Sequence, residues 1–212
     1  MLKIAITTHY GESYQPLADI VLPNTKYYSA LHGYSFFVNK CQTTKNGMYG
    51  FIKTKDARKL LDEFDVVMWI ECDAMIMNHN IKIESFLDEE HDVYLTRDVN
   101  GENSAVAIFK ATQFSKDLLD HIQSKEAELW DEQAVFENYK SDKIHCLPHP
   151  SINSYLYELY GESYGKIGEP LPHKPTHEEG NFEVGDFILH CPGMTLDARL
   201  KIFNEYKNKI VL

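Results

Sequence analysis

The feature that most constrains the fold is a run of five apolar residues, Val66 to Ile70, followed at once by two acids. Residues 64–78 read FDVVMWIECDAMIMN, so Glu71 and Asp73 stand inside the most hydrophobic stretch of the chain. A strand that is apolar at every position is typical of a parallel sheet covered on both faces. Carboxylates beside such a core are costly unless another group pairs with them. The segment therefore predicts a buried strand that leads into a polar site.

The length and charge of the chain exclude some classes of protein. Its 212 residues are enough for a sizeable core, and its net charge of −11 argues against a general nucleic-acid or anionic-membrane surface. This charge still leaves room for a small basic pocket that holds one phosphorylated ligand. No apolar run approaches the roughly 18 residues of a membrane span, and the apolar part of the N-terminus is too short for a signal peptide. The four cysteines form no close CxxC pair and indicate reduced thiols, so we expect a cytoplasmic protein without a transmembrane segment.

Strands and helices alternate in the first half of the chain. Apolar periodicity predicts strands at 2–8, 35–39, 66–70, 92–98, 104–110, 143–148 and 186–191. It predicts helices at 17–31 (ended by Gly33), 51–64, 113–125, 131–139 and 197–210. Early alternation favours a mostly parallel sheet with helices on both faces, and the later strands make the sheet mixed. We expect one α/β domain over residues 1–212, with a functional or mobile loop at 161–185.

The two acids suit a metal ion. In open α/β sheets, ligands bind beyond the carboxyl ends of the strands, and the strand period of two places Glu71 and Asp73 on one side. Converging carboxylates favour Mg²⁺ or Mn²⁺, whose remaining ligands are often water and substrate phosphate oxygens. An equally acceptable alternative is that Asp73 caps a following helical turn.

Other polar residues also allow two interpretations. His190 ends an apolar strand and can reach the same edge of the sheet as a Mn²⁺ ligand, or it is structural. The acids at Asp131 and Glu132 either favour a helix dipole or point with Gln133 into a sugar site. Lys53 and Arg58 lie five residues apart on a predicted helix, and they either meet a diphosphate or base or are simply solvated.

Taken in order, these motifs resemble those of a known family. The chain is similar to metal-dependent nucleotide-sugar glycosyltransferases of the GT-A fold, and most similar to the retaining galactosyl/xylosyltransferase group of yeast mannan and plant xyloglucan synthesis. That group has Trp-x-x-Asp-x-Asp-Ala after the central strand, where this chain has Trp69-Ile-Glu-Cys-Asp-Ala74. The remaining correspondences are Lys53 with Arg58, Asn103-Ser-Ala105 for Asn-Thr-Gly, Asp131-Glu-Gln133 for Asp-Asp-Gln, and Leu189-His-Cys-Pro-Gly193 for Thr-His-Phe-x-Gly. The chain also resembles short viral and bacterial sugar transferases, including the amino-terminal domain of a glycosyltransferase of a large algal virus.

The resemblance implies a function and a set of site residues. It implies a GT-A (Rossmann-like) fold and transfer of a hexose-type sugar from a UDP-sugar to a glycan or glycoprotein hydroxyl, with retention of configuration. It implies a Mn²⁺ (or Mg²⁺) ion held by Asp73 and His190 with help from Glu71. It implies a nucleotide and donor site formed by Thr7, Thr8, His9, Tyr10, Lys53, Arg58, Glu71 and Asn103. The catalytic residues would be Asp131, which bonds sugar hydroxyls, and Gln133, which lies near the anomeric carbon.

The chain departs from the family at several points. Glu replaces the first Asp, the match at Asn103 is loose, and the usual Golgi anchor is missing, so we expect a cytoplasmic enzyme (in host cytoplasm for a viral member) or one part of a longer chain. One alternative is a metal-dependent nucleotidyltransferase, but TTHYGESY lacks the Gly-rich basic loop expected after its first strand. The other is a non-catalytic nucleotide- or carbohydrate-binding domain, which would not need Asp73 and His190 together.

Overall fold

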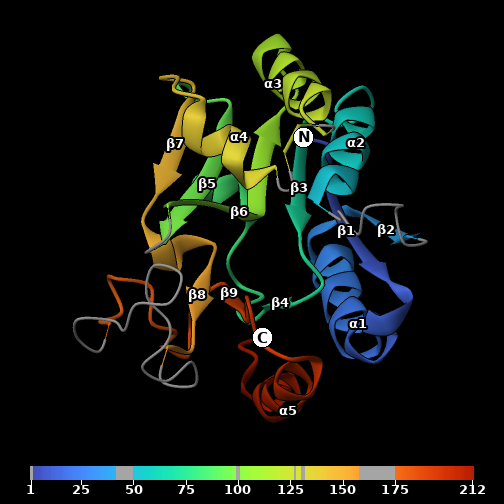
Figure 1. The fold of residues 1–212 in the computed structure, drawn as a ribbon. Helices are drawn as coiled ribbons and strands as arrows, with labels where there is room; N and C mark the ends of the chain where they lie inside the picture. The colour runs from blue at the N-terminus through green and yellow to red at the C-terminus, as the bar shows by residue number, and fades with distance from the viewer. Residues whose placement is uncertain (1, 42–49, 99–100, 127, 130–131, 158–174) are drawn as a thin grey trace.

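The strands of the protein form two sheets within the residues that the structure describes. A computed structural model describes residues 2–41, 50–98, 101–126, 128–129, 132–157 and 175–212 (Figure 1). The main sheet has six strands in the order β2-β1-β3-β6-β5-β7, and the small sheet has three in the order β4-β9-β8. The strands are β1 (Ile4–Gly11), β2 (Ser35–Cys41), β3 (Val66–Ile70), β4 (Ala74–Ile76), β5 (Val93–Asp98), β6 (Gly101–Lys110), β7 (Ile144–Leu147), β8 (Ser154–Tyr155) and β9 (Ile188–His190). The α-helices are α1 (Gln15–His32), α2 (Gly50–Leu60), α3 (Gln113–Ser124), α4 (Gln133–Asn138) and α5 (Leu196–Tyr206).

The main sheet is mixed, as the sequence predicts. Strand β1 runs parallel to β2 and β3, and β5 runs parallel to β7. Strand β6 is antiparallel to both β3 and β5. The interpretation of residues 66–70 as a parallel strand is therefore correct on the side of β1, while the other neighbour of β3 is antiparallel. The predicted α/β class with a mostly parallel sheet is confirmed.

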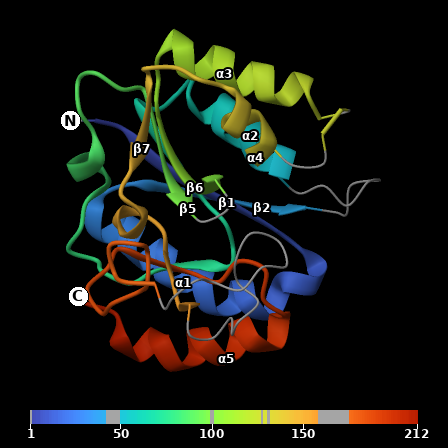
Figure 2. The ribbon, with the colours of Figure 1, turned by 60° about the vertical axis from the view of Figure 1, so that its left-hand side comes forward.

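Helices cover both faces of this sheet, which explains why β3 is apolar throughout. All five residues of β3 are buried. Val66, Met68 and Ile70 pack into the cluster on the face of α1, whereas Val67 and Trp69 pack into the cluster with α2, α3 and α4. Figure 2 shows these three helices on one side of the sheet, with α1 on the other and α5 beyond α1. Each face of the strand thus contributes to a separate core.

The seven predicted strands and five predicted helices are all present, within a few residues of their predicted ends. The helix over 17–31 ends as predicted at Gly33, whose φ of 73° is the left-handed conformation that glycine adopts at low cost. The short strands β4 and β8 were not predicted. Most of the loop at 161–185 lies outside the described residues. Its described end contains an isolated bridge from Asn181 to Tyr155.

Two details of the acidic segment differ from the prediction. Residues 71–73 form a turn in which the Ala74 N–H donates to the Glu71 carbonyl over 3.0 Å, so the strand period does not set the directions of the two acids. Asp73 is followed by strand β4 and not by a helix, so its interpretation as a helix cap is wrong.

The small sheet brings together segments that are far apart in sequence. In the antiparallel pair of β4 and β9, Ala74 lies opposite His190. In the parallel pair of β8 and β9, Tyr155 lies opposite His190. The turn after β3, the start of β8 and the end of β9 therefore meet beside the main sheet. In the part of the chain described, no helix combines the length and apolarity needed to cross a membrane.

Candidate active site

A cavity of about 340 Å³ opens at the carboxyl ends of β1 and β3. Strand β6 begins where β3 ends, because the two are antiparallel, and the Glu71 N–H donates to the Ala105 carbonyl over 3.0 Å. Polar lining residues come from β1, the turn after β3, the start of β6, the start of α4, the end of β9 and α5. They include His9, Tyr10, Glu71, Asp73, Asn103, Glu132, Gln133, His190 and Arg199. The cavity thus lies where the α/β topology favours ligand binding.

The three predicted metal ligands converge at this cavity. Glu71, Asp73 and His190 each offer a ligand atom, and these atoms all lie within 4.8 Å of one another. The pairing of β4 with β9 causes this, since the Cys191 N–H donates to the Asp73 carbonyl over 2.9 Å. His190 is only 1% exposed, and its Nε2 lies 3.5 Å from Asp73 Oδ1. This Nε2 atom is buried and has no hydrogen-bond partner among the described residues.

A buried lysine holds two of the carboxylates at the cavity. Lys53 Nζ lies 2.5 Å from Oε1 of Glu71 and 2.5 Å from Oε1 of Glu132, and it donates to the Ser104 carbonyl over 3.0 Å. Burial opposes the charge on Lys53, but Glu132 and Glu71 outweigh it and hold the Lys53 pKa above its ordinary value. Burial disfavours the charge on Glu71 too, yet Lys53 and His190 lower the Glu71 pKa to about 2. Both groups are therefore charged at neutral pH.

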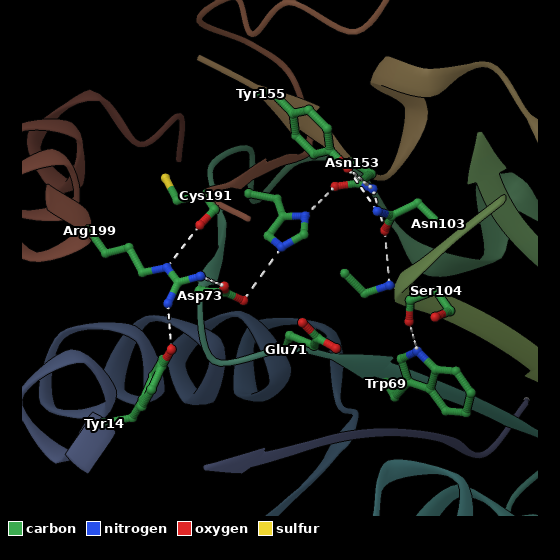
Figure 3. Close-up of polar contacts among 12 residues, drawn as sticks. Tyr14, Trp69, Glu71, Asp73, Asn103, Ser104, Asn153, Tyr155, Cys191 and Arg199 are labelled. Carbon is green, nitrogen blue, oxygen red and sulfur yellow. Dashed lines mark hydrogen bonds and ion pairs between the residues drawn. The ribbon is translucent and has the colours of Figure 1, made fainter. Parts of the chain in front are cut away.

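A second cation, Arg199 of α5, contacts the far side of Asp73 (Figure 3). Its Nη2 lies 2.6 Å from Asp73 Oδ2, its Nε donates to the Cys191 carbonyl over 2.8 Å, and its Nη1 donates to the Tyr14 hydroxyl over 2.5 Å. One oxygen of Asp73, Oδ2, thus forms an ion pair with Arg199, while the other, Oδ1, faces His190 Nε2. This arrangement fixes the direction of the carboxylate.

The structure does not bring every predicted residue to the cavity. Thr7 and Thr8 are buried within β1, whose pairing with β3 ends at Thr7. Of the four predicted residues on this strand, His9 and Tyr10 line the cavity. Arg58 pairs with Asp62 and Asp120 on the outer side of α2. Residues five apart on a helix differ in direction by about 140°, so Lys53 and Arg58 cannot face the same site. Asp131 lies outside the described residues.

Sequence reasoning missed Arg199 as a site residue, and it gave Glu132 no role of its own. Glu132 stands within the recognised motif, but the roles were assigned to its two neighbours. Arg199 lies three residues after Leu196 and four before Phe203, which places a charge on the apolar face of an amphipathic helix. An arginine on the apolar face of a helix could have indicated a buried ion pair, because a buried arginine requires an acidic partner.

A second group of possible metal ligands lies at the opposite end of β5, away from the cavity. Asp88, His91 and His145 offer atoms within 4.8 Å of one another. The Asp88 carboxylate accepts hydrogen bonds from the backbone N–H groups of Glu90 and His91 and lies 2.8 Å from the His91 ring nitrogen. These hydrogen bonds hold the Asp88 carboxylate, whereas His145 Nδ1 lies 3.4 Å from Asp88 Oδ2 and has no hydrogen-bond partner among the described residues.

Comparison with protein families identifies the chain by sequence. A model of the family described as "Protein of unknown function, DUF273" matches residues 25–147, which is more than half of the chain. The chain belongs to the DUF273 family. No curated protein sequence matches it. The DUF273 match includes Glu71, Asp73 and Gln133, whereas His9, His190 and Arg199 lie beyond it.

Comparison with solved structures identifies the fold of this DUF273 member. It is similar to a glycosyltransferase involved in glycosylation of the major capsid of PBCV-1, with a TM-score of 0.73, 14% identity, and coverage of 96% of this chain and 99% of that one. It is similar to the glycosyltransferase GlyE of Streptococcus pneumoniae TIGR4, with a TM-score of 0.56, 12% identity, and coverage of 100% and 65%. It is similar to an active-site mutant of LgtC, with a TM-score of 0.56, 12% identity, and coverage of 98% and 96%. The predicted GT-A glycosyltransferase fold is confirmed.

Proposed function

We propose that the protein is a metal-dependent glycosyltransferase that moves a hexose-type sugar from a UDP-sugar to a hydroxyl of a glycan or glycoprotein, with retention of configuration. The observation that carries the proposal is the convergence of Glu71, Asp73 and His190 on one cavity at the carboxyl ends of β1 and β3. The similarity to LgtC, a galactosyltransferase whose structure was solved with donor and acceptor sugar analogs, supports the same chemistry.

The residues at the cavity fit a divalent ion. His190 Nε2 has no hydrogen-bond partner among the described residues and faces an Asp73 oxygen at 3.5 Å. A cation placed between the nitrogen lone pair and the carboxylate oxygen would bind to both atoms and stabilise their arrangement. This set of one nitrogen and several oxygen ligands suits Mn²⁺ better than Mg²⁺. Asp73 and His190 would hold the ion, and Glu71 would assist. When bound, the ion stabilises the negative charge that develops on the departing nucleoside diphosphate.

The remaining lining residues are suited to the organic parts of the donor. His9 and Tyr10 lie at the end of β1, where we place the uridine. Asn103 and Gln133 line the cavity from the start of β6 and of α4, where we place the sugar. Gln133 has no titratable proton acceptor, so its role is to bind and orient. Asp131 remains our proposal for the residue that bonds the sugar hydroxyls.

The charges at the cavity favour retention. The described acidic residues that line it are Glu71, Asp73 and Glu132, and each is paired with Lys53 or Arg199. Such pairing lowers the basicity of a carboxylate and opposes its use as a nucleophile or general base. We therefore favour a front-side path. The bond from the anomeric carbon to the diphosphate breaks, the acceptor oxygen bonds to the same face, and the departing phosphate takes the acceptor proton.

Calorimetric titration tests this proposal. The protein is titrated with UDP-glucose, UDP-galactose, UDP-N-acetylglucosamine, UDP-xylose and GDP-mannose, in the presence of Mn²⁺ and again with EDTA. We expect at least one UDP-sugar to bind only with Mn²⁺, and this binding to be lost in Asp73→Asn. Asp62→Asn, which alters a surface ion pair, is the matched control. Because Asp73→Asn removes the negative charge that pairs with Arg199, the fold of this variant is checked by circular dichroism. Binding without metal, a preference for GDP-mannose, or no binding at all would overturn the proposal.

A further inference from the structure

We propose that Asn153 is a positioning residue, which determines the ring nitrogen of His190 that carries the proton and so aims the other nitrogen at the metal. The inference deepens the proposed function and rests on it. A histidine binds a metal through a nitrogen that carries no proton, and the partner of its second nitrogen decides which one that is. In this structure the partner can be traced back to a backbone amide through two buried asparagines.

The chain of hydrogen bonds begins at Ala105. Its backbone N–H lies 3.0 Å from Oδ1 of Asn103. A backbone N–H can only donate, so the atom that faces it must be the amide oxygen and not the NH₂ group. The other end of Asn103 agrees, because its Nδ2 faces a carboxylate oxygen of Asp98 at 3.1 Å, and an ionised carboxylate can only accept. The orientation of the Asn103 amide is therefore determined twice.

The orientation of Asn103 determines that of Asn153. The amide oxygen of Asn103 has no proton to give, so the Asn153 atom 2.9 Å away must be the NH₂ group. The same group donates to Thr96 Oγ1 over 3.2 Å. The oxygen of Asn153 is then the atom 2.9 Å from Nδ1 of His190. Figure 3 shows Asn103 and Asn153 side by side, with Tyr155 above them.

The orientation of Asn153 determines the tautomer of His190. Nδ1 must carry the proton, because an unprotonated Nδ1 would set two lone pairs against each other at 2.9 Å. Nε2 of the neutral ring then carries the lone pair, and it points toward Asp73 Oδ1 at 3.5 Å. Asn153 is fully buried and His190 nearly so, so bulk water cannot take over the role of the amide oxygen.

The small sheet explains why Asn153 is in place. Strand β8 runs parallel to β9 with Ser154 opposite Leu189 and Tyr155 opposite His190. Asn153 directly precedes β8 and is thereby held beside the ring. The residue that fixes the tautomer and the proposed metal ligand are thus positioned by the same pair of strands.

Nitrogen NMR tests the tautomer in the metal-free protein. Ring-¹⁵N-labelled histidine is incorporated, the metal is removed with EDTA, and the His190 signals are assigned by their absence in His190→Gln. We expect the Nδ1–H tautomer in the parent protein and a mixture of tautomers in Asn153→Ala. The Nε2–H tautomer in the parent overturns the inference. This measurement uses no metal or sugar, so it is independent of the proposed function.

Metal affinity tests the consequence. Loss of the partner of a metal-binding histidine typically weakens binding by about 10- to 100-fold, and we expect this loss of Mn²⁺ affinity in Asn153→Ala by electron paramagnetic resonance titration. Asn24→Ala is the matched control, since it removes another asparagine oxygen from a buried histidine, His79, over 2.8 Å. Its Mn²⁺ affinity should equal that of the parent. Unchanged affinity in a folded Asn153→Ala would overturn the inference, whereas a parent protein that binds no Mn²⁺ would instead refute the proposed function.

Discussion

The Nζ atom of Lys53 lies 2.5 Å from Oε1 of Glu132, and the two side chains are only 3% and 1% exposed. Glu71 approaches the same nitrogen from the cavity. Removing one partner of a buried ion pair leaves a charge in a medium that solvates it poorly. The ion pair of Lys53 and Glu132 therefore positions side chains of the candidate site, and loss of either partner should destabilise the fold.

Lys53→Met should destabilise the protein strongly, because it leaves Glu132 buried without its cation. We expect a loss of about 3–5 kcal/mol in the free energy of unfolding, measured by urea denaturation. Lys55→Met is the control two residues away. Its ion pair with Glu126 is exposed, so the expected loss is under about 1 kcal/mol. The double variant Lys53→Met/Glu132→Gln should recover part of the loss. Equal losses of stability in Lys53→Met and Lys55→Met would contradict the conclusion that Glu132 depends on Lys53 as its buried cation.

His190→Ala should weaken Mn²⁺ binding more than Asn153→Ala does, because it removes the ligand itself. The expected loss exceeds about 100-fold in a titration with UDP present. His91→Ala, from the second histidine and aspartate cluster, is the control and should bind Mn²⁺ like the parent. If His91→Ala loses Mn²⁺ affinity and His190→Ala keeps it, the metal binds at the cluster of Asp88, His91 and His145, and our placement of the site is wrong.

The cysteines should differ sharply in their reaction with iodoacetamide at pH 8. Burial, with a further contribution from Asp73, raises the pKa of Cys72 to about 12, so almost none of it is thiolate. Cys146 is exposed and should be labelled first, as mass spectrometry of proteolytic fragments can show. Cys146→Ser should remove the fast phase. Labelling of Cys72 at the rate of Cys146 in the native protein would show that the turn after β3 is open.

The first sugar product should have the anomeric configuration of the donor. The described carboxylates at the cavity are paired with cations, and this pairing disfavours the general base that inversion requires. Proton NMR of the product measures the configuration, which stays fixed once the glycosidic bond has formed. Inversion would reject the front-side path and would point to Asp131 as a base.

The sequence predicted the elements of the fold better than the contacts of the site. Residues 66–70 and the helix stop at Gly33 could be predicted because apolar periodicity and glycine conformation are local properties. The convergence of Asp73 with His190 was expected from the edge of one sheet, but it depends on the pairing of β4 with β9, two strands of three residues each. Strands this short have no periodicity to detect. The partners of Lys53 and Arg199 could not be predicted either, since each lies in a distant segment.

The pairing of β4 with β9 also determines when the candidate site can come into being. Ala74 and His190, which lie opposite each other, are more than a hundred positions apart in the chain. A ribosome releases Glu71 and Asp73 long before the last ligand, and contacts that close so large a loop form late in folding. The earlier strands can assemble around β3 without that contact. We therefore expect a refolding chain to gain its sheet signal first and its affinity for metal last, which would make the ion a reporter of the final step.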